Sequence, residues 1–160
     1  MALLVYFREP VKGRSVKRVY SRLFAMAREI LDVLGVEVVG VEVAKLRLVK
    51  RTEIDRKELG PEVIPVKLDR RFRFREKVDL SEYTWKYSDG YVSFFASYNG
   101  ERAFGTAILN VGIPKRARKP WGDLTINLHN NDKDISGIIP EGKIAEALGK
   151  LDFIGAWHFD

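Results

Sequence analysis

The sequence predicts an α+β fold in which a mainly antiparallel sheet carries one long and one short helix. Apolar residues recur about every 3.6 positions between residues 15 and 34, which is typical of an amphipathic helix. Residues 91–98 and 101–111 flank Asn99 and Gly100, a pair that favours the two-residue turn of a hairpin. The order of strand, helix, several consecutive strands, helix and strand is typical of helices on one face of an antiparallel sheet.

The 160 residues are predicted to form a single domain. Hydrophobic residues make up 46% of the chain and charged residues 31%, which is typical of a globular protein rather than a disordered one. The absence of cysteine excludes a disulfide framework, a thiolate metal site and a cysteine nucleophile. We find neither a signal-peptide core nor a membrane-spanning run, so we expect a cytoplasmic protein with no membrane partner.

The first third of the chain is expected to contain a strand, the long helix and an irregular second strand. Residues 3–7 are all apolar, which is typical of a central strand buried on both faces. Ser15 is the expected N-cap of the helix, and Gly35 is expected just beyond its C-terminus. The apolar phase shifts within residues 36–49, so we expect a strand with breaks or bulges, the first of them at Gly40.

An arginine-rich segment follows in the middle of the chain. Residues 50–61 are polar and predict a loop or a short helix, and a short strand is expected over residues 63–68. Residues 71–75 read Arg-Phe-Arg-Phe-Arg, an alternation that in a strand puts the guanidinium groups on one side and the rings on the other. We therefore predict a strand that displays three arginines together, namely Arg71, Arg73 and Arg75.

A hairpin around Asn99 and Gly100 is the strongest local signal in the sequence. This pair favours the two-residue type I′ turn, which fixes the register of the flanking strands. Counting outward from the turn predicts that Phe95 lies opposite Phe104. Phe94 is then expected opposite Gly105.

The last third of the chain is expected to complete the sheet. After a basic loop over residues 112–122, alternation predicts a strand over residues 124–128, then a short helix over residues 140–150 and a closing strand over residues 153–159. Because the chain begins with strand, helix, strand and ends with helix, strand, a ferredoxin-like fold with an inserted hairpin is an alternative topology.

The formal net charge of +6 is unevenly distributed. Basic residues predominate up to residue 119, and acidic residues outnumber them beyond it. A basic body suits a polyanionic partner, since each phosphate contact releases condensed counterions. A composition rich in Lys, Arg and Glu is also typical of thermophile surfaces that carry ion-pair networks. Both interpretations of the charge stay open.

Our leading hypothesis is a nucleic-acid-binding domain. RNA or single-stranded DNA is favoured over duplex because aromatic residues interleave with the basic clusters. Trp121 beside a cationic loop suits base stacking, and packing of that loop onto the sheet is an equal alternative. The candidate residues are Lys17, Arg18, Arg22, Arg71, Arg73, Arg75, Lys115, Arg116, Arg118, Lys119 and Trp121.

The loop before the long helix is a candidate phosphate-binding site. Backbone N–H groups and the helix dipole attract anions at a helix N-terminus. Lys12, Arg14 and Ser15 would supply the side chains. The loop matches neither a P-loop nor a dinucleotide-binding fingerprint, so simple helix capping with solvated charge is the alternative.

A second hypothesis is a phosphodiesterase or nuclease. Strand alternation puts Asp123 and His129 on one face, and Asp132 and Asp134 follow with oxygen ligands of the kind that Mg²⁺ prefers. His129 and His158 could work as general acid and base. An Asx-rich turn beside an edge strand accounts for the same residues without catalysis. We predict no metal or cofactor, with Mg²⁺ implied only by the nuclease hypothesis.

A third hypothesis is an interaction or self-assembly protein. The basic body of one copy would meet the acidic C-terminal quarter of another, giving a homo-oligomer whose association weakens with salt.

Overall fold

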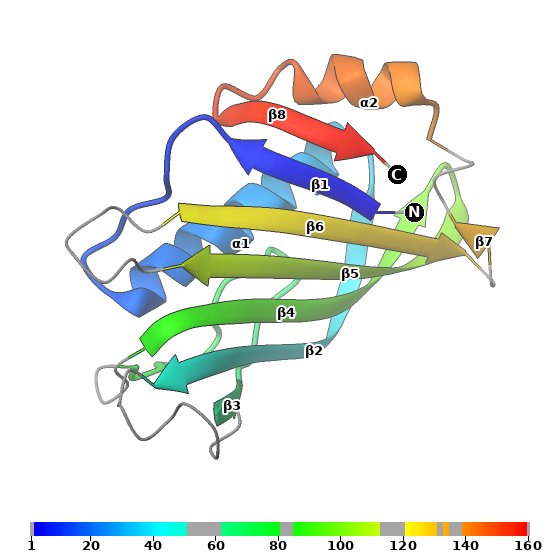
Figure 1. Cartoon of the computed structure of the whole chain (residues 1–160). Helices are drawn as coiled ribbons and strands as arrows, with labels where there is room; N and C mark the ends of the chain where they lie inside the picture. The colour runs from blue at the N-terminus through cyan, green and yellow to red at the C-terminus, as the bar shows by residue number, and fades with distance from the viewer. Residues whose placement is uncertain are drawn as a thin grey trace.

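The computed structural model of the chain describes residues 2–50, 62–80, 85–112, 121–130, 133–134 and 139–159, and it confirms the α+β class. Within these ranges the strands form one antiparallel sheet in the order β3-β2-β4-β5-β6-β1-β8, with β7 paired to β6 (Figure 1). Along the chain the elements are β1 (Ala2–Phe7), α1 (Val16–Val33), β2 (Glu37–Lys50), β3 (Glu62–Pro65), β4 (Trp85–Tyr98), β5 (Glu101–Gly112), β6 (Trp121–Asn130), β7 (Lys133–Asp134), α2 (Glu141–Leu148) and β8 (Ile154–Phe159).

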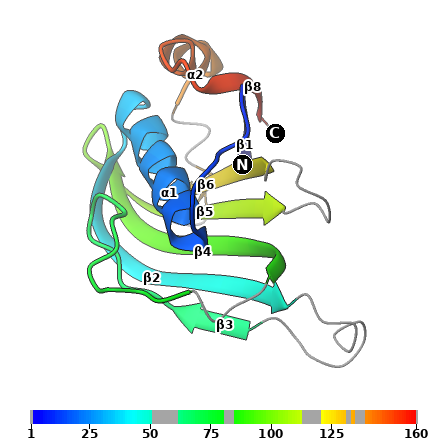
Figure 2. The ribbon, with the colours of Figure 1, turned by 90° about the vertical axis from the view of Figure 1, so that its left-hand side faces the viewer.

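The sheet has a covered face and an open face. Helix α1 crosses one face, and the long strands β2 and β4 bend around it (Figure 2). We call this the covered face and the opposite one the open face. Helix α2 contacts α1 near the end of the sheet formed by β1 and β8 (Figure 1). No helix in the described ranges is both long and apolar enough to cross a membrane.

Helix α1 begins and ends where the sequence predicts. The Ser15 hydroxyl accepts a hydrogen bond from the Arg18 amide at 3.3 Å, which caps the first turn. Gly35 follows the C-cap with a φ of 78°, a conformation that glycine adopts without strain. The apolar stripe of the helix is buried against the sheet, with Leu23 and Phe24 at 0% exposure.

A buried polar contact also fixes α1 on the sheet. The hydroxyl groups of Tyr20 on α1 and Ser88 on β4 are hydrogen-bonded. Burial raises the pKa of Tyr20 above its ordinary value, and the bond to Ser88 opposes that rise only in part. The phenol is therefore neutral at physiological pH, and its polar group is satisfied inside the core.

The hairpin register is confirmed. Phe95 pairs with Phe104, and Phe94 pairs with Gly105, in the ladder between β4 and β5. A Cβ atom built on Gly105 would lie 2.2 Å from the ring of Phe94, so the glycine makes room for that ring on the covered face. The predicted irregularity of the second strand is also confirmed, because β2 has bulges between Val38 and Gly40 and between Val41 and Val43.

The position of β1 differs from the prediction of a central strand buried on both faces. It lies between β6 and the edge strand β8, and only Leu3 and Val5 are buried. Tyr6, which points to the open face, is 47% exposed. The apolar run correctly predicts a strand. Because the described residues form no layer over the open face, one side of that strand stays accessible.

The ferredoxin-like alternative stays a prediction. The chain does run β1-α1-β2 at one end and α2-β8 at the other. The successive antiparallel ladders from β1 through β6, β5 and β4 to β2 make β1 and β2 run in the same direction, as the two strands of a βαβ unit do. Three strands, β4, β5 and β6, lie between β1 and β2 in the sheet.

Candidate nucleic-acid interface

The arginine-rich segment forms a tight turn instead of the predicted strand. We call residues 69–75 the arginine turn. The Asp69 carboxylate accepts hydrogen bonds from the Arg71 amide at 2.8 Å, the Arg73 amide at 3.0 Å and the Arg73 Nε at 2.9 Å. The Phe72 amide also donates to the Asp69 carbonyl at 2.9 Å. An aspartate that bonds its own backbone two and four residues on closes a turn in place of extended pairing.

Two phenylalanines anchor the arginine turn in the core. Phe72 has a φ of 60°, which is unusual for a bulky residue, and its side chain is 1% exposed. Its ring centroid lies 5.4 Å from that of Phe94 on β4. The Phe74 ring meets the Phe24 ring of α1 edge-on at 5.9 Å. The turn is thus packed onto the covered face, beside the middle of α1.

The exposed positions of the turn are basic. Among the described residues, the side chains of Arg70, Arg71 and Arg75 are exposed and take part in no ion pair. Arg73 is paired to Asp69 and its side chain is still 71% exposed. The alternation predicted from the sequence therefore survives in the burial pattern, rings inward and guanidinium groups outward, although the backbone is not a strand.

The Asp69 carboxylate stays ionised under physiological conditions. Partial desolvation raises its pKa, but the hydrogen bonds from the Arg73 amide, the Arg73 guanidinium and the Arg71 amide outweigh that effect. The pKa of Asp69 is consequently lowered from its ordinary value. The negative charge that closes the turn is therefore present at neutral pH.

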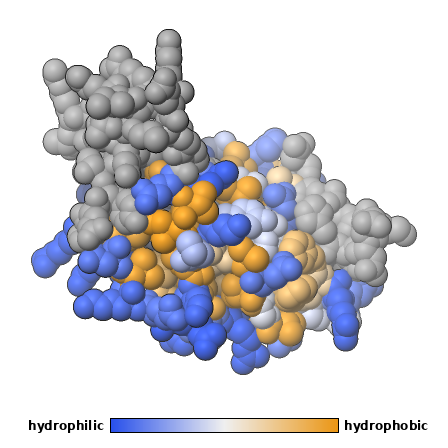
Figure 3. All heavy atoms as spheres, turned by 90° about the horizontal axis from the view of Figure 1, so that it is seen from below, coloured by the Kyte–Doolittle hydropathy of each residue, from blue (hydrophilic) through white to orange (hydrophobic). Residues whose placement is uncertain are grey.

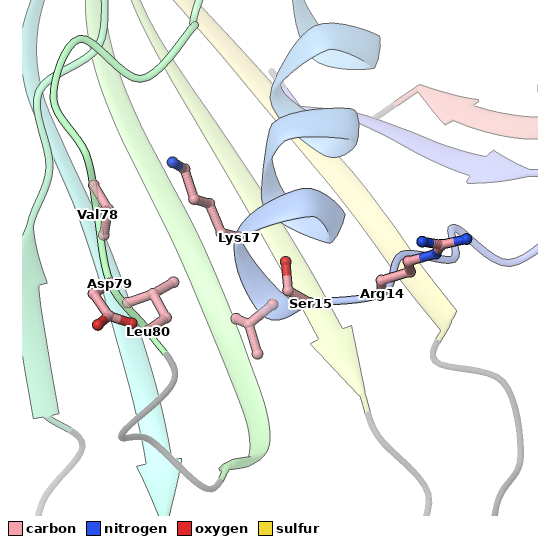
Figure 4. A pocket seen from close by; sticks show the side chains of 7 residues that line it. Arg14, Ser15, Lys17, Val78, Asp79 and Leu80 are labelled. Atoms are coloured by element: carbon pink, nitrogen blue, oxygen red, sulfur yellow. The ribbon is translucent and has the colours of Figure 1, made fainter.

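A cavity separates the start of α1 from the segment that follows the arginine turn. It has a volume of about 410 Å³ and is lined by Arg14, Ser15, Val16 and Lys17 on one side and by Val78, Asp79 and Leu80 on the other. In Figure 4, Lys17 extends toward Val78, and Arg14 points away on the other side of Ser15. Of the predicted phosphate-binding residues, Arg14 and Ser15 thus line the cavity, and Lys12 does not.

Two of the predicted basic clusters lie on the same side of the sheet. Lys17, Arg18 and Arg22 belong to the first turns of α1, on the layer that covers the sheet. The arginine turn packs beside the same helix, as the contact between Phe24 and Phe74 shows. The Arg22 guanidinium donates a hydrogen bond to the Lys12 carbonyl at 3.0 Å. Lys17 and Arg18 lie on α1 about two turns before Phe24, the residue that the arginine turn contacts.

The third predicted cluster lies outside the described residues. Lys115, Arg116, Arg118 and Lys119 fall in residues 113–120. Trp121 begins β6, where its backbone pairs with Gly112, and its side chain is not described. The choice between base stacking and loop packing for Trp121 therefore stays open.

The described residues of the nuclease hypothesis lie apart on strands β6, β7 and β8. Asp123, Thr125 and Asn127 lie there together on β6, as alternation predicts, and the backbone of His129 pairs with that of Asp134 on β7. Leu4 pairs with both Thr125 and His158, so His158 lies two strands across from β6 and four residues along from His129. Strand geometry makes that separation about 16 Å between Cα atoms. Asp132 lies outside the described residues, and the part of the chain that is described holds no cluster able to bind a metal.

The open face carries the predicted aromatic pair of the hairpin. Phe95 is 49% exposed and meets the Phe104 ring edge-on at 5.8 Å. The Ser93 hydroxyl donates to the Tyr91 hydroxyl at 2.8 Å, and Ser93 itself is buried. Seen from the side of β2 and β3, apolar atoms lie exposed among hydrophilic ones (Figure 3). The charged groups of this face are mixed in sign, as in the ion pair between Arg47 and Asp89 at 2.6 Å.

Sequence reasoning missed Asp69, which closes the arginine turn. The signal that could have found it is an aspartate two residues before an arginine, which is typical of an Asx turn. Comparisons with known proteins found no matching family model, no significantly similar curated protein and no significantly similar solved structure. The candidate interface is accordingly defined by residues of this chain alone, the arginine turn and the start of α1.

Proposed function

We propose that the protein binds nucleic acid through its phosphate backbone, using the arginine turn together with Lys17 and Arg18. The observation that carries this proposal is the juxtaposition of two basic segments that are far apart in the sequence. One is the start of α1 and the other is the arginine turn, which packs beside that helix through Phe74. Clustering of exposed, unpaired guanidinium groups is the electrostatic footprint of a polyanion-binding surface.

The chemistry of the exposed groups favours phosphate as the ligand. Guanidinium groups are always charged and match phosphate oxygens with pairs of parallel donors. Each phosphate contact releases counterions, so affinity should fall steeply with salt and depend little on base sequence. The rings of Phe72 and Phe74 face the core and cannot stack on bases. A preference for RNA or single-stranded DNA therefore depends on Trp121 and its basic neighbours.

A matched pair of charge reversals tests the proposal. Arg71→Glu with Arg75→Glu alters the basic surface, and Lys45→Glu with Arg102→Glu makes the same change in net charge on exposed residues of the open face. Binding is measured by fluorescence anisotropy with labelled single- and double-stranded RNA and DNA over a series of salt concentrations. Circular dichroism and urea unfolding verify that all variants are folded.

The proposal expects only the first pair to impair binding. Its affinity should fall about tenfold or more, and the slope of log affinity against log salt should decrease by about 1.5 for two lost phosphate contacts. If both double variants lost the same affinity for nucleic acid, binding would depend only on the net charge of the protein. Wild-type affinity no higher than that of a generic basic protein of the same charge would refute the function altogether.

A further inference from the structure

An acidic residue lies at the centre of the proposed binding surface. Asp69 is surrounded by arginines, and its carboxylate would repel a phosphate. A surface selected only for positive charge would not retain it. The hydrogen bonds of this residue offer a reason for its presence.

The two carboxylate oxygens of Asp69 accept different hydrogen bonds. Oδ1 accepts both backbone bonds, from the amides of Arg71 and Arg73, and so fixes the backbone of the turn. Oδ2 accepts the side-chain bond from the Arg73 Nε. The turn is closed further by the bond from the Asp69 amide to the Arg73 carbonyl at 2.9 Å, while Phe72 anchors it in the core. The backbone that carries the exposed arginines is thus held in one conformation without a ligand.

We propose that Asp69 is a positioning residue of the phosphate-binding surface, whose Oδ1 atom holds the arginine turn preformed for nucleic-acid phosphates. This inference rests on the proposed function. The preformed turn presents Arg70, Arg71 and Arg75 at fixed spacing, so the chain need not be ordered when it binds. Binding to a preorganised surface avoids the entropy of ordering, and the affinity then exceeds what charge alone provides.

Two substitutions of Asp69 separate geometry from charge. Asp69→Asn and Asp69→Ala each remove one negative charge and each release Arg73 from its ion pair. Asparagine retains a carbonyl oxygen in the place of Oδ1, which can still accept the two amide bonds, whereas alanine cannot. A surface that works through charge alone predicts tighter binding of both variants to the same extent.

Positioning predicts a different order of affinities. Asp69→Asn should bind nucleic acid at least as tightly as the wild type, and Asp69→Ala should bind about tenfold more weakly than Asp69→Asn despite the identical charge. Binding is measured by anisotropy with a labelled oligonucleotide at fixed salt. Exchange of the Arg71 and Arg73 amide protons, followed by NMR, should accelerate in Asp69→Ala and stay slow in Asp69→Asn.

Each outcome decides the inference. If Asp69→Ala binds as tightly as Asp69→Asn, positioning by Oδ1 is refuted and the proposed function stands. If the wild type itself does not bind nucleic acid, the proposed function fails and this inference fails with it. Urea unfolding of both variants shows whether weaker binding reflects a loss of the fold.

Discussion

On the covered face of the sheet Phe94 is fully buried, whereas one residue later in the same strand Phe95 is 49% exposed on the open face. The ring of Phe94 packs against Phe72, which anchors the arginine turn, and fits over Gly105. The ring of Phe95 meets only Phe104 among the described aromatic residues. The same contrast in packing holds for the two faces as a whole. The basic surface is built upon the tightly packed layer, and the open face offers apolar and mixed-charge groups.

This difference indicates why the basic groups lie where they do. Long basic side chains lose conformational freedom when they bind a ligand, and a rigid support limits that loss to the side chains themselves. Helix α1 and the arginine turn are both fixed to the covered face by aromatic contacts. The open face is better suited to contacts that do not depend on long side chains.

Truncation of the adjacent phenylalanines should give the largest contrast between the faces. Phe94→Ala is expected to lower the free energy of unfolding by about 4 kcal/mol, because it leaves a cavity among fully buried neighbours. Phe95→Ala is expected to lower it by about 1 kcal/mol or less, since half of that side chain is already in water. Urea unfolding at equilibrium measures both. Similar losses would contradict the assignment of the two faces.

Glycine substitutions sharpen the same comparison. Gly105→Ala should destabilise the fold by about 2–3 kcal/mol, because the added methyl group would collide with the ring of Phe94. Gly40→Ala on β2 is the control, because nothing lies within 4 Å of a Cβ atom at that position and no unusual φ is involved. Thermal unfolding followed by circular dichroism distinguishes them. A tolerated Gly105→Ala would mean that Phe94 can move.

Removal of the helix cap should have a smaller effect. Ser15→Ala removes the acceptor of the Arg18 amide and should cost about 1 kcal/mol of stability. Ser15→Asp retains an acceptor and should be close to the wild type in stability, while its negative charge weakens nucleic-acid binding beside Lys17. Urea unfolding and anisotropy measured on the same samples test the two effects. If Ser15→Asp bound nucleic acid normally, the start of α1 would not belong to the interface.

Acid should loosen the arginine turn with only a small effect on the whole fold. Because the pKa of Asp69 is lowered in the folded protein, its stabilising contribution is present above the ordinary aspartate pKa and is lost as the pH falls through the folded value. The amide shifts of Arg71 and Arg73 should therefore stay constant from pH 7 to pH 5 and change only below about pH 4. Asp69→Asn should show no such titration at these amides. A transition near pH 6 would contradict the lowered pKa.

Local chemistry made α1 and the hairpin predictable from the sequence. Ser15 and Gly35 mark the helix ends by side-chain capping and by a positive φ, and Asn99–Gly100 fixes a register without reference to the rest of the chain. The phase shifts of β2 were predictable for the same reason. Each of these features depends on interactions between residues that are close in the sequence.

Most of the failures concern features that depend on distant partners. An alternation of arginine and phenylalanine is compatible with a strand and with a turn. The turn is closed by the nearby Asp69 carboxylate, a local signal that was overlooked, and it is anchored by the distant rings of Phe24 and Phe94. The burial of β1 depends on which layers cover the sheet, which no property of residues 3–7 can reveal. The juxtaposition of α1 and the arginine turn is likewise a product of packing across the sheet.

The bulges of β2 also determine where the length of the chain can change. Each bulge inserts an extra residue into the pairing with β4, so deletion of Val39 would turn the first one into regular pairing. A deletion within the regular stretch from Ala44 to Leu48 would instead shift the register by one and turn buried side chains such as Leu46 to the open face. Natural insertions and deletions in relatives of this chain should accordingly accumulate at residues 38–43 and be excluded from the stretch that follows.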